Sequence, residues 1–287
     1  MTPKRTLITV IIPCYNSRNY LKKTVSEILT VFSASDMKNL SSAADIENPN
    51  SAVFQHAARQ NKTDISGTGK FRCCGLQLIL IDDASPDKTF EIIEELCGAA
   101  FPNKPDANIC SACSSSAISA KATACHVEIC GIRLDSNHGQ NRAKMTGIPF
   151  IKGDYCIFMD DDGQHDPRAI PLLIQKIDEG YDLVYAQFPK RRESPFRSLA
   201  SHITELMLTV FNKKPRGIQI TSFFALSRAS IDYLQGMTEY AQTVGQCLFP
   251  HTDKIAGIKI PHRSRSEGSS NYSYKKLFSL WWHWLRD

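Results

Sequence analysis

Three consecutive carboxylates at residues 160–162 directly follow an apolar run, residues 155–159, that is typical of a buried strand. Side chains alternate along an extended chain, so Asp160 and Asp162 are expected to point the same way from the end of that strand. Two such carboxylates repel each other unless a cation lies between them. Their hard oxygen ligands suit Mg²⁺ or Mn²⁺, with the phosphates of a substrate completing the shell. The alternative is a solvated acidic turn before a helix.

A second acidic pair, Asp82 and Asp83, follows another apolar run at residues 76–81. Ligands bind at the carboxyl ends of the strands in open α/β sheets, so both acidic groups are expected at one crevice. Their oxygens can accept hydrogen bonds from a base or a ribose and can hold a metal that bridges a diphosphate. No Gly-x-Gly-x-x-Gly follows the first strand, which argues against a classical dinucleotide site.

The order of the predicted elements indicates an α/β fold, because strands that alternate with helices of this length form a mostly parallel sheet. The first part of the chain has expected strands at residues 7–13, 76–81, 127–132, 155–159 and 182–186. Helices follow several of them, with Ser85 and Pro86 expected to begin one and Asp166 and Pro167 another. Two irregular stretches are expected to be insertions, at about residues 33–70 and 99–124.

The pattern changes after residue 186. A strand is expected at residues 219–226, a short helix around Ile231 and Leu234, and an edge strand at residues 254–261. We therefore expect a single domain over residues 1–287. Its parts are a donor-binding part, an acceptor-side part and a terminal helix, at residues 1–186, 187–271 and 272–287.

Basic charge gathers in the last third of the chain. The net charge is +5, and the basic residues concentrate at residues 190–216 and 259–287. This distribution suits anionic substrates or an anionic membrane surface, and no nucleic-acid recognition motif accompanies it. Arg263 and Arg265 lie in a polar loop, where an arginine fork could clamp phosphate oxygens; the alternative is a solvated basic loop.

The final segment, residues 272–287, contains all three tryptophans of the chain together with basic residues. A mixture of aromatic and basic side chains suits a helix that lies in a membrane interface. The alternative is a helix docked on the core of the protein. We favour the interface, because tryptophans that are nearly consecutive are hard to bury on one helix face.

The composition, with 42% hydrophobic and 22% charged residues, is that of a soluble globular protein. No apolar run reaches the roughly 18 residues of a membrane span, and the N-terminus passes directly into a strand without the pattern of a secretory signal. Ten cysteines without such a signal favour free thiols in a reducing compartment. The alternative for some of them is a zinc site made by Cys110, Cys113, Cys125 and His126.

Five motifs together resemble the inverting nucleotide-sugar glycosyltransferases of family 2, which have the GT-A fold, and especially their polyprenyl- and dolichyl-phosphate branch. These motifs lie at residues 11–16, 81–87, 137–141, 153–167 and 265–272. The resemblance implies a nucleotide pocket lined by Pro13, Tyr15, Asn16 and Asp83, with Asp82 close by. We place Asp161 with this donor-binding set.

The same resemblance implies a metal site in which Asp160 and Asp162 form the Asp-x-Asp motif and Gln164 completes the shell. Arg265 would meet the diphosphate or the acceptor phosphate. The chain departs from the family pattern in two ways: Asn271 stands where a lysine is often found, and no membrane hairpin follows that motif.

The implied activity is metal-dependent, inverting transfer of a sugar from a UDP- or GDP-sugar to a polyprenyl phosphate. The expected location is the cytoplasmic side, peripheral to the inner face of the membrane. One alternative is transfer to a saccharide hydroxyl in cell-surface polysaccharide synthesis. Another is a sugar-nucleotide-binding protein without catalytic activity.

Overall fold

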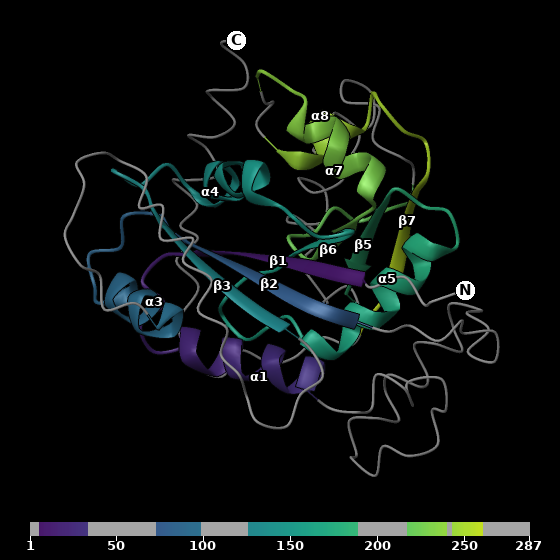
Figure 1. Cartoon of the computed structure of the whole chain (residues 1–287). Helices are drawn as coiled ribbons and strands as arrows, with labels where there is room; N and C mark the ends of the chain where they lie inside the picture. The colour runs from purple at the N-terminus through teal and green to yellow at the C-terminus, as the bar shows by residue number, and fades with distance from the viewer. Residues whose placement is uncertain (1–5, 34–72, 99–125, 189–216, 240–242, 261–287) are drawn as a thin grey trace, which may run out of the picture.

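A seven-stranded sheet forms the centre of the structure, which is a computed structural model (Figure 1). The structure describes residues 6–33, 73–98, 126–188, 217–239 and 243–260. The strand order in this part is β3-β2-β1-β4-β6-β5-β7. The strands are β1 Thr6–Cys14, β2 Cys73–Asp82, β3 His126–Arg133, β4 Tyr155–Phe158, β5 Leu183–Gln187, β6 Phe224–Leu226 and β7 Ile255–Lys259.

Neighbouring strands pair in parallel, except that β6 is antiparallel to both β4 and β5. This arrangement confirms the predicted mostly parallel α/β sheet. Parallel strands are buried on both faces, which explains why their sequences are nearly continuous apolar runs. In β1, for example, Ile8 and Val10 pack into the core on one face and Ile11 into the core on the other.

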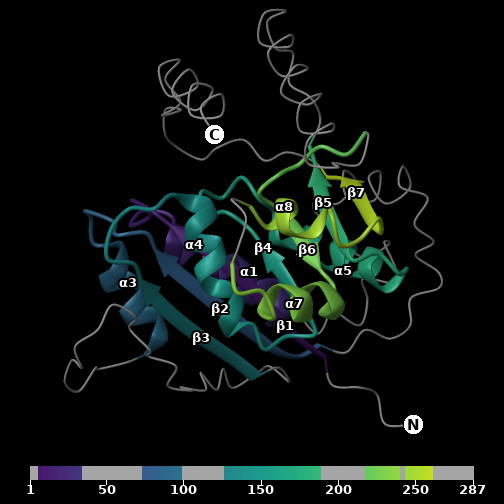
Figure 2. The same cartoon turned by 90° about the horizontal axis from the view of Figure 1, so that it is seen from above.

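Helices cover both faces of the sheet, and each layer of helices closes its own hydrophobic core. The first core contains α1 (Leu21–Ser33), α3 (Thr89–Cys97), the 3-10 helix η4 (Pro167–Ala169) and α5 (Ile170–Asp178). The second contains α4 (Gln140–Gly147), the 3-10 helix η3 (Ile148–Phe150), α7 (Arg228–Gln235) and α8 (Val244–Leu248). Figures 1 and 2 show α1 and α3 on one side of the sheet and α4 and α7 on the other.

The helix after β2 begins later than the sequence predicts. Ser85 does not cap a helix; its hydroxyl oxygen accepts a hydrogen bond from the Asn16 backbone N–H at 3.1 Å. The helix begins at Thr89, whose N–H donates to the Asp87 carboxylate at 3.0 Å. The other predicted cap is confirmed, because the Asp166 side chain accepts from the Arg168 N–H at 3.0 Å ahead of α5.

The acceptor-side part also differs in detail. The strand expected at residues 219–226 is limited to Phe224–Leu226, whereas the edge strand is confirmed as β7. The predicted insertions, the clustered cysteines at residues 110–125 and the terminal segment lie outside the described residues, apart from Ser33 at the end of α1. No helix within the described ranges is long and apolar enough to cross a membrane.

Gly153 allows the chain to enter β4 next to β1. A Cβ atom built at Gly153 would lie 2.7 Å from the Thr9 backbone nitrogen and 2.7 Å from the Tyr155 carbonyl oxygen. Neither backbone atom can move without disturbing the strand pairing beside it. We therefore expect Gly153→Ala to lower the free energy of unfolding by about 1–3 kcal/mol in urea denaturation. Gly236→Ala is the matched control, because its Cβ would meet nothing closer than 3.5 Å; an equal loss in both variants would contradict this explanation.

Candidate active site

The carboxyl ends of β1, β2 and β4 meet at one edge of the sheet. Cys14 at the end of β1 pairs with Asp82 at the end of β2, and the N–H of Met159, just after β4, donates to the Ile11 carbonyl oxygen at 3.2 Å. The two predicted acidic groups therefore follow neighbouring strands. This is the edge at which open α/β sheets bind ligands.

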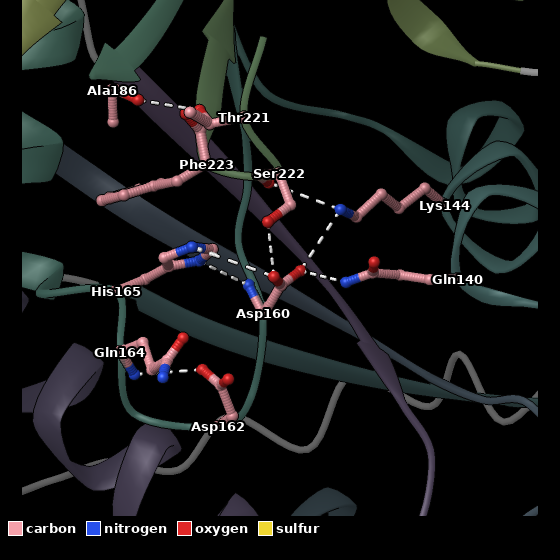
Figure 3. Close-up of polar contacts among 10 residues, drawn as sticks. All are labelled: Gln140, Lys144, Asp160, Asp162, Gln164, His165, Ala186, Thr221, Ser222 and Phe223. Carbon is pink, nitrogen blue, oxygen red and sulfur yellow. Dashed lines mark hydrogen bonds and ion pairs between the residues drawn. The ribbon is translucent and has the colours of Figure 1, made fainter. Parts of the chain in front are cut away.

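Asp160 lies at the centre of a polar cluster drawn in Figure 3. Its Oδ1 accepts hydrogen bonds from the Gln140 amide and from Lys144 Nζ, the latter at 3.3 Å. Its Oδ2 accepts from the Ser222 hydroxyl. Three segments that are distant in sequence thus converge on this carboxylate: α4, the loop after β4 and the segment before β6.

The electrostatic surroundings keep Asp160 ionised. Burial alone would raise the pKa of its carboxyl group, but the positive charge of Lys144 and the hydrogen bonds from Ser222 and Lys144 hold the pKa below its usual value. Burial lowers the pKa of Lys144, and the charge of Asp160 partly opposes that shift. The two groups therefore stabilise each other's charged forms, and only 5% of the Lys144 side chain is exposed.

His165 fixes the loop that carries Asp160. Its imidazole is stacked between Phe188 and Phe223, with ring centroids 5.7 Å and 4.9 Å away. Its Nδ1 lies 2.9 Å from the Asp160 backbone nitrogen and accepts that N–H, so the proton of the neutral ring is on Nε2. Nε2 lies 3.8 Å from Asp160 Oδ2. The histidine thus contacts both the backbone and the carboxylate of Asp160.

Asp161 faces a different part of the protein. Its carboxylate accepts a hydrogen bond from the Ser17 hydroxyl, and its carbonyl oxygen accepts from the Thr24 hydroxyl at 2.9 Å. Burial raises the pKa of Asp161 to about 7. The Ser17 hydrogen bond lowers this pKa, and the negative charges of Asp160 and Asp162 raise it further. These contacts attach the loop to the start of α1.

Asp162 and Gln164 lie together in the turn of the same loop (Figure 3). The Gln164 N–H donates to Asp162 Oδ1 at 3.0 Å, and Gly163 between them has a φ of +73°. The extended conformation expected through Asp162 is therefore not observed, because the strand ends at Phe158 and the chain then bends. In Figure 3 the Asp162 carboxylate faces Gln164, whereas that of Asp160 faces Lys144.

The carboxylates of Asp82 and Asp83 both accept hydrogen bonds from backbone N–H groups. Asp83 is 2% exposed and accepts the N–H groups of His138 and Gly139, each at 2.8 Å. Because these residues directly precede α4, Asp83 fixes the start of the helix that carries Gln140 and Lys144.

Asp82 is fully buried. Its Oδ1 accepts the Ser85 N–H at 3.2 Å, and its Oδ2 has no hydrogen bond within the described residues but lies 3.5 Å from Arg133 Nε. Burial raises the pKa of Asp82 above its usual value. The hydrogen bonds from Ser85 and the positive charge of Arg133 partly oppose this shift.

The remaining predicted donor-site residues lie at the end of β1. Pro13 is buried within the strand, whereas Tyr15 is 48% exposed and Asn16 is exposed in the turn. Asn16, two residues after β1, and Ala84, two residues after β2, have φ values of +56° and +53°. This left-handed conformation is one that asparagine tolerates better than alanine. Arg265 lies outside the described residues, so its place relative to these groups stays a prediction.

The sequence interpretation gave no role to Lys144, Ser222 or His165. Lys144 lies one helical turn after Gln140 and so on the same face of α4. A lone lysine in a helix is usually solvated, however. Ser222 comes from a segment 62 residues beyond Asp160, and no local pattern links the two. No three His, Cys, Asp or Glu side chains in the described part of the chain gather closely enough to hold a metal.

Comparisons with known proteins agree with this arrangement. Residues 113–234 match the family Glycosyl transferase family 2. An undecaprenyl-phosphate 4-deoxy-4-formamido-L-arabinose transferase of Photorhabdus laumondii is 29% identical over 71% of this chain and 55% of its own length. The enzyme of the same name from Salmonella paratyphi B is 27% identical over 87% of this chain and 67% of its own length. This chain thus spans about half to two thirds of these relatives.

A solved structure with a similar fold is glucosyl-3-phosphoglycerate synthase from Mycobacterium tuberculosis, in complex with Mn²⁺, UDP-glucose and phosphoglyceric acid. It superposes with a TM-score of 0.53 at 16% identity, over 95% of this chain and 74% of the synthase. At this identity the likeness concerns the fold alone. It agrees with the GT-A arrangement of a mostly parallel sheet between helices.

Proposed function

We propose that this chain is a glycosyltransferase of family 2 and that it transfers a sugar from a nucleotide-sugar to a polyprenyl phosphate. The observation that carries this proposal is Asp160, an ionised carboxylate at the carboxyl end of β4, where a donor's phosphates and a cation can meet. The named activity of the two relatives supports a lipid phosphate as the acceptor. The site of action would then be the inner face of a membrane.

The proposed metal ligands are Asp160, Asp162 and Gln164. Their donor chemistry fits Mg²⁺ or Mn²⁺, because two carboxylates and a side-chain amide supply hard oxygen ligands from one loop. A divalent cation bound there would offset the negative charge that develops on the leaving nucleoside diphosphate. The Mn²⁺ and UDP-glucose held by the Mycobacterium tuberculosis synthase support the choice of ligand class.

The proposed nucleotide pocket lies at the ends of β1 and β2. Tyr15 and Asn16 are exposed there and are the groups best placed to meet a base and a ribose. Pro13, Asp82 and Asp83 are buried at the same strand ends. Asp83 would act by positioning the loop before α4, because both of its oxygens already accept backbone N–H groups.

The acceptor chemistry follows from the charge of a phosphate. A polyprenyl phosphate carries an anionic oxygen, which can attack the anomeric carbon from the side opposite the diphosphate without a strong general base, inverting that carbon. A saccharide hydroxyl would need a carboxylate within hydrogen-bond reach to accept its proton. Arg265 is proposed to meet the donor diphosphate or the acceptor phosphate.

The test is a transfer assay with radiolabelled UDP- or GDP-sugars, undecaprenyl phosphate in detergent, and Mn²⁺. We expect label in a product that is extracted into organic solvent and released by mild acid, and we expect EDTA to abolish it. Label that appears only in a water-soluble saccharide would favour the saccharide acceptor. Binding of UDP without any transfer or donor hydrolysis would indicate the non-catalytic alternative.

A further inference from the structure

Lys144 is a buried ammonium group inside the candidate active site. It is 4% exposed, and its Nζ donates to Asp160 Oδ1 at 3.3 Å and to the Ser222 carbonyl oxygen at 3.4 Å. Lysine is almost never this buried unless it is paired with an opposite charge. Figure 3 shows the side chain reaching from α4 across to the Asp160 carboxylate.

The Asp160 carboxylate is already largely saturated by the protein. Each carboxylate oxygen offers about two lone-pair positions. Oδ1 uses both, for Gln140 and Lys144, while Oδ2 accepts from Ser222. A divalent cation that needs Oδ1 must therefore displace Lys144 or Gln140, and one that binds Oδ2 must sit beside an ammonium group.

We propose, on the basis of the function proposed above, that Lys144 is an internal counter-cation that occupies Asp160 before the donor binds and competes with the divalent cation for that carboxylate. Asp160 then has a positively charged partner at all times: Lys144 in the free protein, and the divalent cation once it is bound. Like charges a few ångströms apart in a partly buried site repel strongly, so the lysine weakens cation binding to the free protein.

The exchange also couples the cation to the donor. When the cation takes Asp160, the ammonium of Lys144 is left without its carboxylate in a site proposed to receive a diphosphate. The anionic donor then provides the missing counter-charge, so each ligand strengthens the binding of the other by the same factor. Lys144 thus favours joint binding of cation and donor over binding of the cation alone.

The test is Mn²⁺ binding to the protein without nucleotide, sugar or lipid, measured by calorimetry. We expect Lys144→Met, which removes the charge at similar length, to bind Mn²⁺ at least about tenfold more tightly than the wild type. Lys144→Arg keeps the charge and is expected to stay within about threefold of the wild type. In an Asp160→Asn background, Lys144→Met should no longer tighten binding.

Circular dichroism checks that each variant is folded, and Lys144→Gln replaces Lys144→Met if the latter is not. Equal or weaker Mn²⁺ binding by the charge-removing variant, or no Mn²⁺ binding by any variant, would overturn the inference. Because no donor or acceptor is present, this result does not depend on transfer. A wild type that binds Mn²⁺ as expected but transfers no sugar would instead refute the proposed function.

Discussion

Replacing Asp162 with alanine is expected to lower kcat for sugar transfer by about 10²–10³-fold or more while the protein stays folded. Asp162 is partly exposed in the loop after β4 and accepts the N–H of Gln164 from the same turn. It belongs to neither hydrophobic core, so its loss should change the cation site far more than the fold. The measurement is single-turnover transfer with saturating donor and Mn²⁺, together with the thermal midpoint of unfolding.

Asp253→Ala is the matched control for that experiment. Asp253 is an exposed aspartate just before β7, at the opposite end of the sheet from the carboxyl ends that carry the site. We expect it to keep wild-type turnover. Undiminished turnover in Asp162→Ala would remove Asp162 from the proposed metal ligands.

Replacing Asp160 with asparagine is expected to lower the free energy of unfolding by about 2–4 kcal/mol. This loss is slightly smaller than that for breaking a fully buried ion pair, because 20% of the Asp160 side chain is exposed. The loss arises because Lys144 stays buried without a counter-charge. The double variant Asp160→Asn/Lys144→Met should therefore lose much less than the sum of the two single changes. Urea denaturation of all four proteins measures this coupling.

An exposed ion pair provides the comparison for this cycle. Lys22 and Glu95 lie 2.7 Å apart on the surface, with 54% and 65% of their side chains exposed. Glu95→Gln should change the free energy of unfolding far less, because solvent already screens the pair. Additive losses in the Asp160 and Lys144 cycle would show that the two buried groups do not stabilise each other.

Most of the sheet could be predicted because its strands are buried on both faces. Runs such as residues 76–81 have too many consecutive apolar, β-branched or long aliphatic residues for any exposed element, and the structure places them as β2. The acidic residues that end β2 and follow β4 lie at one sheet edge because parallel strands bring their carboxyl ends together. The location of the site therefore followed from local sequence.

The contacts within the site could not be predicted, because they join distant segments. Ser85 has the residue type of a helix cap, yet its hydroxyl is used by Asn16, 69 residues earlier in the chain. Lys144 has the residue type of a surface position, and only the approach of Asp160 and the Ser222 carbonyl explains its burial. Strand β6 pairs over only Phe224–Leu226, which is too short for a periodic pattern.

The antiparallel strand β6 determines the order in which the sheet can be completed. It lies between β4 and β5, so β5 can be connected to β4 in the sheet only after residues 224–226 have been synthesised. A nascent chain that ends before this point has a β4 that can pair only with β1, and an Asp160 without Ser222. During synthesis, the polar cluster can therefore be completed only with the segment that joins the two parts of the sheet.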